Sequence, residues 1–194
     1  MYLEGGDLLR ITESELLRFS LHVGLDIDDR TVVELQRSGA RSETRARAAN
    51  MISARPLSRR ELVKRLCEKG ADGADAEAAA DWLEELGALS DADYAAALVR
   101  HYGGMGYGEA KLRDELHRRG VPRELWEEAL SKSPDARETI LRVLAQKTKG
   151  RATGEKERKR LSDMLLRRGF PWSEVRAALA EFCENAAEPD GCDE

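Results

Sequence analysis

Apolar residues recur at helical spacing in three similar stretches of the chain. The stretches are LVKRLCEKGAD at residues 62–72, LRDELHRRGVP at residues 112–122 and LSDMLLRRGFP at residues 161–171. In each, two leucines four residues apart share one face of a predicted helix, and a glycine ends it. The closing glycines, Gly70, Gly120 and Gly169, are 50 and 49 residues apart. A fixed period of this length indicates an internal repeat.

Further helical patterns lie on both sides of each stretch. The preceding ones cover Arg45–Ala54, Asp91–Tyr102 and Asp135–Thr148, and the following ones carry Trp82, Trp126 and Trp172 with neighbouring leucines. The sequence therefore predicts an all-α protein with three tandem three-helix repeats, at residues 41–90, 91–132 and 133–183. A unit of this size buries too little apolar surface to fold alone, so we expect the repeats to stack as an elongated array.

Local signals mark several boundaries within the repeats. Ser58 and Glu61 form a predicted capping box for the middle helix of the first repeat. Ser133, before Pro134, is expected to open the third repeat in the same way. The alanine-rich stretch ADGADAEAAA, residues 71–80, is interpreted as a connection.

The two ends of the chain depart from the repeat. Gly5-Gly6, between short apolar pieces, is a hairpin signal. A capping box from Thr12 to Glu15 predicts a short helix through Phe19, and a second short helix is expected over Arg30–Arg37. Residues 1–40 are thus predicted to form a small strand-bearing extension, a hairpin plus short helices. Residues 184–194 are acidic and aperiodic, which predicts a disordered tail.

Composition limits the classes of protein that fit. The chain has 194 residues, of which 41% are hydrophobic and 36% charged, and a net charge of -5. Since no apolar run approaches the roughly 18 residues of a membrane span, we expect a cytoplasmic protein. The three cysteines form no CxxC pair, so a metal or redox site is not predicted. Cys67 is expected in the core.

No pattern of catalytic residues is recognisable. The three histidines, His22, His101 and His117, lie in unrelated contexts, so we expect neither an enzyme nor a cofactor or metal site. The glycine-rich run GGMGYG, residues 103–108, lacks the Lys-Ser/Thr of a P-loop and follows a helix. It is interpreted as a flexible connection, or alternatively as a loop whose amides, with Lys111, contact a nucleic-acid phosphate.

Positive charge is concentrated although the chain is acidic overall. Residues 133–170 contain 11 Lys or Arg against 5 Asp or Glu. Inward-facing leucines on the middle helices leave most basic residues exposed. If the repeats stack with similar orientation, these residues form a discontinuous basic strip that suits a phosphate backbone or an acidic protein groove. The predicted strip comprises Arg59, Arg60, Lys64, Arg65, Lys111, Arg113, Arg118, Arg119, Lys156, Arg158, Lys159, Arg160, Arg167 and Arg168.

Four stretches, in order, resemble the RecX family of bacterial regulators of the RecA recombinase. They are ARPLSRRELVKRLCEKG, LGALSDADYAAALV, GEAKLRDELHRRGVP and LLRRGFPWSEVRAAL, and the resemblance covers residues 40 to 183. It implies a crescent of three tandem three-helix repeats without enzymatic activity. It also implies a partner, a RecA-type recombinase filament on single-stranded DNA, whose strand exchange, ATP hydrolysis and co-protease activity are restrained by binding in or along the helical groove.

We expect the protein to act as a monomer that lies across several recombinase protomers, with many weak contacts adding up. Binding to bare DNA would be weak and non-specific. Two other classes remain open: a sequence-specific DNA-binding regulator of the helix-turn-helix type, and a helical adaptor for an unrelated partner. On this reading Arg167 and Arg168 serve binding and are not needed for packing.

Overall fold

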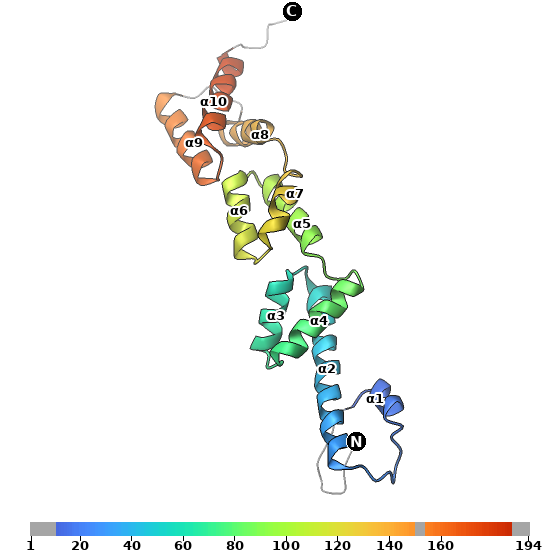
Figure 1. Ribbon diagram of the computed structural model, residues 1–194. Coiled ribbons are helices and arrows are strands. Elements are labelled where there is room, and N and C mark those ends of the chain that lie inside the picture. The colour runs from blue at the N-terminus through green and yellow to red at the C-terminus, as the bar shows by residue number, and fades with distance from the viewer. Residues whose placement is uncertain (1–10, 150–153, 188–194) are drawn as a thin grey trace, which may run out of the picture. The chain divides into compact units, whose positions relative to one another are not determined.

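Every regular secondary-structure element in the described part of the chain is a helix (Figure 1). The structure, a computed structural model, describes residues 11–149 and 154–187, with side chains up to Glu184. It divides into two compact units, residues 1–90 and 91–194. No helix in the described ranges is both long enough and apolar enough to span a membrane. The predicted hairpin around Gly5-Gly6 lies outside the described residues, and no strand occurs within them.

The first unit contains the first three-helix repeat and a short helix before it. Its elements are α1 (Glu13–Arg18), α2 (Asp29–Ala54), α3 (Arg59–Glu68) and α4 (Gly73–Glu85). The end of α2 packs with α3 and α4 around a core that includes Leu62 and Leu66, both fully buried. Three alanines, Ala76, Ala79 and Ala80, are fully buried on α4. The alanine-rich stretch is therefore mostly helix and not a connection, because its small side chains let α4 pack closely.

Helix α2 is a single long helix where the sequence predicts two. The expected short helix ends at Arg37, and the expected helix of the first repeat begins at Arg45, yet α2 runs through both. The predicted boundary between residues 40 and 41 thus lies inside a helix. Gly39 disfavours a helix by about 1 kcal/mol relative to alanine, which makes a break plausible from sequence. The hydroxyl of Thr44 donates to the carbonyl of Ala40 at 2.8 Å within this polar segment.

The second unit contains two repeats with separate cores. The second repeat comprises α5 (Asp91–Gly104), α6 (Glu109–Arg118), a 3-10 turn η1 (Arg123–Leu125) and α7 (Trp126–Leu130). The third comprises α8 (Ala136–Thr148), α9 (Glu155–Arg167) and α10 (Trp172–Ala187). The leucines of the repeat, Leu112 with Leu116 and Leu161 with Leu165, are buried in these two cores.

The repeated glycines end the middle helices as predicted. Gly70, Gly120 and Gly169 have positive φ angles of 89°, 72° and 90°. In each case the next residue donates its amide to the carbonyl of the last repeat leucine, at 3.0, 3.1 and 3.3 Å. This six-to-one bond is characteristic of a Schellman end, which needs a left-handed residue that glycine adopts at little cost. The second leucine of each repeat therefore fills the core and accepts the terminating hydrogen bond.

Three local predictions are corrected. Cys67 is exposed because it lies on the outer side of α3. The third repeat is opened by Asp135, whose carboxylate accepts from the amide of Glu138 at 2.9 Å, and not by Ser133. Helix α10 continues to Ala187, so the predicted disordered tail begins within a helix, while residues 188–194 lie outside the described ranges. The predicted caps at Thr12 and Ser58 are present, the first as a full capping box.

Candidate functional site

Arg59, at the start of α3, is held within its own repeat. Its guanidinium pairs with three carboxylates of α4, those of Glu77, Asp81 and Glu84, at 2.7, 2.7 and 2.6 Å. Burial opposes its charge, but hydrogen bonds to Asp81 and Glu77 and the charge of Glu84 outweigh this and raise the pKa of Arg59. Arg59 is therefore a poor candidate for binding another molecule. Its guanidinium would have to leave three carboxylates, which would then repel one another.

The other predicted cations of α3 differ in whether they pair with a carboxylate. Arg65 pairs with Glu61 at 2.9 Å, whereas Lys64 is 3.8 Å from Glu68 and 74% exposed. Arg60 is exposed and has no ion pair with any described residue. Of this set, Arg60 and Lys64 therefore remain available on the surface of the first unit.

Most predicted cations of α6 also have carboxylate partners. Arg113 bridges Glu109 and Glu127 at 2.8 and 2.9 Å, and hydrogen bonds to both carboxylates raise the pKa of Arg113. Arg118 pairs with the buried carboxylate of Glu115, and that hydrogen bond raises the pKa of Arg118.

Lys111 is 3.8 Å from the same Glu115 carboxylate, and Arg119 is half-buried. The basic side chains of α6 thus serve largely to compensate its own acidic residues.

Helix α9 is different, because its cations are exposed and unpaired. Lys156, Arg158, Lys159, Arg160 and Arg167 are all exposed, and none forms an ion pair with a residue in the described ranges. Lys156, Lys159, Arg160 and Arg167, the α9 basic face, lie opposite the buried leucines of the helix, with Asp163 among them. Arg158 lies off this face. Most of the predicted strip's exposed and unpaired cations therefore lie on one helix of the third repeat.

Arg168, the last predicted cation, joins the third repeat to the second. Its Nη1 donates to the carbonyls of Met105 and Gly106 at 3.1 and 3.0 Å, and its guanidinium lies 5.5 Å from the ring centre of Tyr107. Arg168 therefore packs against the preceding repeat, a contact that the sequence analysis does not predict. The two arginines before Gly169 have separate roles, because Arg167 points outward and Arg168 contacts the preceding repeat.

The glycine-rich run is the surface that receives Arg168. The amide of Gly108 donates to the carbonyl of Arg168 at 2.8 Å, and that of Ala110 donates to Gly169 at 3.2 Å. A Cβ on Gly108 would lie 2.5 Å from the Gly169 oxygen, and one on Gly106 would lie 2.6 Å from Val143. Close approach of the two backbones explains Gly108, and a positive φ of 81° together with packing against Val143 explains Gly106. The run is neither a flexible connection nor, at these amides, a free phosphate loop, since the amides are occupied.

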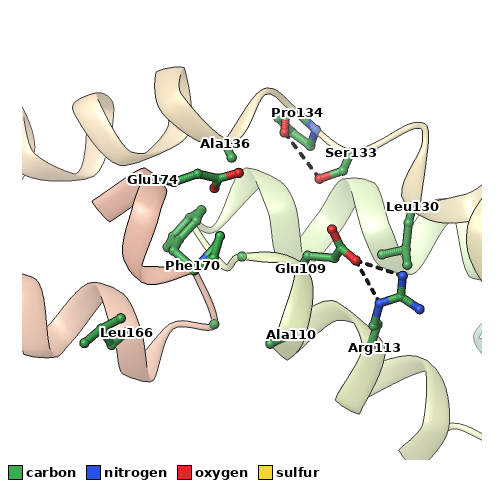
Figure 2. A pocket seen from close by; sticks show the side chains of 13 residues that line it. Glu109, Ala110, Arg113, Leu130, Ser133, Pro134, Ala136, Leu166, Phe170 and Glu174 are labelled. Carbon is green, nitrogen blue, oxygen red and sulfur yellow. Dashed lines mark hydrogen bonds and ion pairs between the residues drawn. The ribbon is translucent and has the colours of Figure 1, made fainter. Parts of the chain in front are cut away.

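A cleft of about 580 Å³ lies beside this joint, between the second and third repeats (Figure 2). Its wall includes Leu130, Leu166 and Phe170, and the paired Glu109 and Arg113. Glu174 also faces it, and burial first, then the charges of Asp135 and Glu109, raises the pKa of Glu174. The lining thus holds two carboxylates and one guanidinium, so it lacks the excess of positive charge of the α9 basic face.

Sequence reasoning missed two features of the third repeat. One is the joint, whose only signal was the glycine run followed one repeat later by RRGF. The other is Trp172, which is 58% exposed at the start of α10, whereas Trp82 and Trp126 are half-buried against their cores. Within the described ranges, no group of three His, Cys, Asp or Glu side chains could hold a metal ion.

Comparison with known proteins follows the same division into repeats. Residues 90–130 match the family model described as "RecX, second three-helix domain", and residues 135–179 match "RecX, third three-helix domain". A regulatory protein RecX of Chromohalobacter salexigens is 34% identical over 139 residues, which cover 71% of this chain and 91% of that protein. One from Xanthomonas axonopodis pv. citri is 34% identical, over 68% of this chain and 83% of that protein.

Solved structures agree on the fold. A crystal structure of regulatory protein RecX superposes with a TM-score of 0.73 at 20% identity, covering 93% of this chain and 91% of that chain. RecX from Lactobacillus salivarius gives a TM-score of 0.66 at 19% identity, covering 75% and 97%.

Proposed function

Because the chain belongs to the RecX family of regulatory proteins, we propose that it binds RecA-type recombinase filaments on single-stranded DNA through the α9 basic face. Binding restrains strand exchange, ATP hydrolysis and co-protease activity, so the protein regulates DNA repair and recombination without catalysing a reaction itself. On this proposal, the protein acts as a monomer in the cytoplasm.

The distribution of unpaired cations supports this choice of surface. A cation that is already paired must lose its partner before it meets a new one, whereas an exposed, unpaired cation gives up only water. Lys156, Arg160 and Arg167 recur on one side of α9 over three helical turns. A row of positive charge suits either the phosphates of the bound strand or an acidic protein surface. Trp172, exposed at the start of the next helix, adds an aromatic contact.

The joint between repeats contributes rigidity. Arg168 and the close Gly108–Gly169 contact fix the third repeat against the second. If both repeats contact the filament, holding them in one arrangement lowers the entropy lost on binding.

A charge-neutralised variant tests the proposal. In it, Lys156, Lys159, Arg160 and Arg167 are changed to Gln. The matched control changes four exposed cations elsewhere, Lys69, Arg100, Lys132 and Lys147, to Gln, which alters net charge equally. ATP hydrolysis and strand exchange by a recombinase filament are followed with each protein. We expect the control to act like wild type and the α9 variant to lose most of its effect; no effect of wild-type protein at stoichiometric amounts would refute the proposal.

The helix-turn-helix alternative fits the charges less well. In such proteins the helix after the turn enters the major groove. Here the helices after the glycine turns are acidic: α4 carries Glu77, Asp81 and Glu84, and α7 carries Glu127 and Glu128. Phosphates would repel these helices. Tight, sequence-selective binding to one duplex would nevertheless favour that alternative, and consistent capture of an unrelated protein would favour a helical adaptor.

A further inference from the structure

A second concentration of positive charge lies in the first unit, between α1 and α2. A cleft of about 490 Å³ is lined by four arginines, Arg18 from α1 and Arg37, Arg41 and Arg45 from α2. The three α2 arginines are four residues apart, so they share one side of the helix, with a rise of about 6 Å from each to the next. The matched family models begin at residue 90, well beyond this cleft.

Three of these arginines are oriented by contacts with neighbouring side chains. Arg41 donates from Nε to Asp75 at 3.0 Å, which uses one of its five N–H donors. The guanidinium of Arg45 lies 5.6 Å from the ring centre of Trp82, and that of Arg18 lies 5.6 Å from Phe19. Arg37 is exposed and forms no ion pair with a described residue. The cleft therefore presents guanidinium groups that are partly preorganised and incompletely neutralised.

Two carboxylates line the same cleft, and neither removes this charge. Glu15 is 2% exposed and accepts hydrogen bonds from the Thr12 amide at 2.8 Å and the Ser42 hydroxyl at 2.7 Å. Its acceptor positions are thus used within the fold. Glu34 is exposed, so water screens its charge. Four guanidinium groups against two carboxylates leave the cleft positive.

We propose that this cleft binds a phosphate group carried by a nucleotide or a nucleic-acid strand. The planar fork of arginine matches phosphate oxygens with two parallel hydrogen bonds, which a lysine does not provide. The cleft is larger than one phosphate requires, and the half-buried ring of Phe19 in its wall offers a surface for a sugar or base. The proposal is independent of the α9 basic face, since it rests on different residues in the other unit.

Binding of ATP and of a fluorescent ten-nucleotide dT strand to the full-length protein tests the site. We expect the double variant Arg37→Gln, Arg41→Gln to bind at least one of these about 10-fold more weakly, because two charge-assisted contacts are lost. Arg30→Gln, on the same helix but outside the cleft lining, should bind like wild type. Inorganic phosphate should compete in either case. If ATP binds and the dT strand does not, the phosphate is that of a free nucleotide. If the dT strand binds and ATP displaces it, the phosphate is that of a nucleic-acid strand.

Two further measurements keep the test decisive. Glu34→Gln should bind about two- to fivefold more tightly, since a nearby negative charge is removed from the cleft lining without disturbing the arginines. The α9 variant should keep its ATP affinity, which separates this site from the filament surface. Equal affinity of wild type and the double variant, or no binding of ATP or dT at millimolar concentration, would overturn the proposal. Binding of a phosphoserine peptide but of neither nucleotide ligand would also overturn it.

Discussion

Replacing Arg168 with alanine should loosen the joint between the second and third repeats. The change removes two hydrogen bonds to the carbonyls of Met105 and Gly106 and the contact with the Tyr107 ring. A hydrogen bond contributes about 1 kcal/mol and a partly exposed cation–π contact about 0.5 kcal/mol. Allowing for solvent at the half-buried site, the loss is about 2 kcal/mol, which corresponds to roughly 30-fold more frequent opening of the joint.

Amide hydrogen exchange reports this opening directly. The amides of Gly108 and Ala110 donate across the joint, so their exchange should accelerate by roughly 30-fold in Arg168→Ala, while amides in the two repeat cores should keep their protection. Arg167→Ala is the matched control, because Arg167 is the neighbouring arginine but is exposed and unpaired. Unchanged exchange at Gly108 in Arg168→Ala, or the same acceleration in Arg167→Ala, would refute the assigned roles.

Two other predictions concern the same unit. Gly108→Ala should destabilise the protein by about 1 to 3 kcal/mol, because the new Cβ would lie 2.5 Å from the Gly169 oxygen. Gly104→Ala is the control and should not destabilise it, because Gly104 has open space around it. Thermal denaturation compares the two variants, and equal midpoints would contradict the close contact at Gly108. Glu174→Gln should raise the stability of the folded protein at pH 7. Because the pKa of Glu174 is raised in the folded protein, the wild type loses stability as the pH rises towards that pKa, and glutamine cannot ionise. The gain should vanish well below pH 4.5, the ordinary value, where both forms are neutral; denaturant titrations from pH 3 to 8 measure this, and a gain that persists at pH 3 would contradict it.

Local sequence signals predicted the parts of the fold that depend on local interactions. The leucine pairs, the closing glycines and the caps at Thr12 and Ser58 lie where expected, because helix periodicity and helix ends are determined within a few residues. The sequence predicts two helices in place of α2, because the middle of α2 is polar and contains Gly39 and so carries no apolar periodicity that would indicate a continuous helix.

Which basic residues pair with a carboxylate could not be predicted from such local signals. Arg118 and Arg167 occupy equivalent positions before a glycine and are both exposed, and Arg119 and Arg168 are both half-buried. Yet Arg118 pairs with Glu115, while Arg167 has no ion pair within the described ranges. Whether a cation is neutralised depends on which carboxylates the fold brings near it, and for Arg59 these come from another helix.

The most direct measurement of the central claim is the affinity for a recombinase filament assembled on fluorescent single-stranded DNA. It is measured at several salt concentrations for wild type, the α9 variant and the control with four other exposed cations neutralised. If each α9 cation contributes about 0.5 kcal/mol, the α9 variant binds roughly 30-fold more weakly and with a smaller salt dependence, and the control binds like wild type. Equal affinities for the two variants would contradict the account.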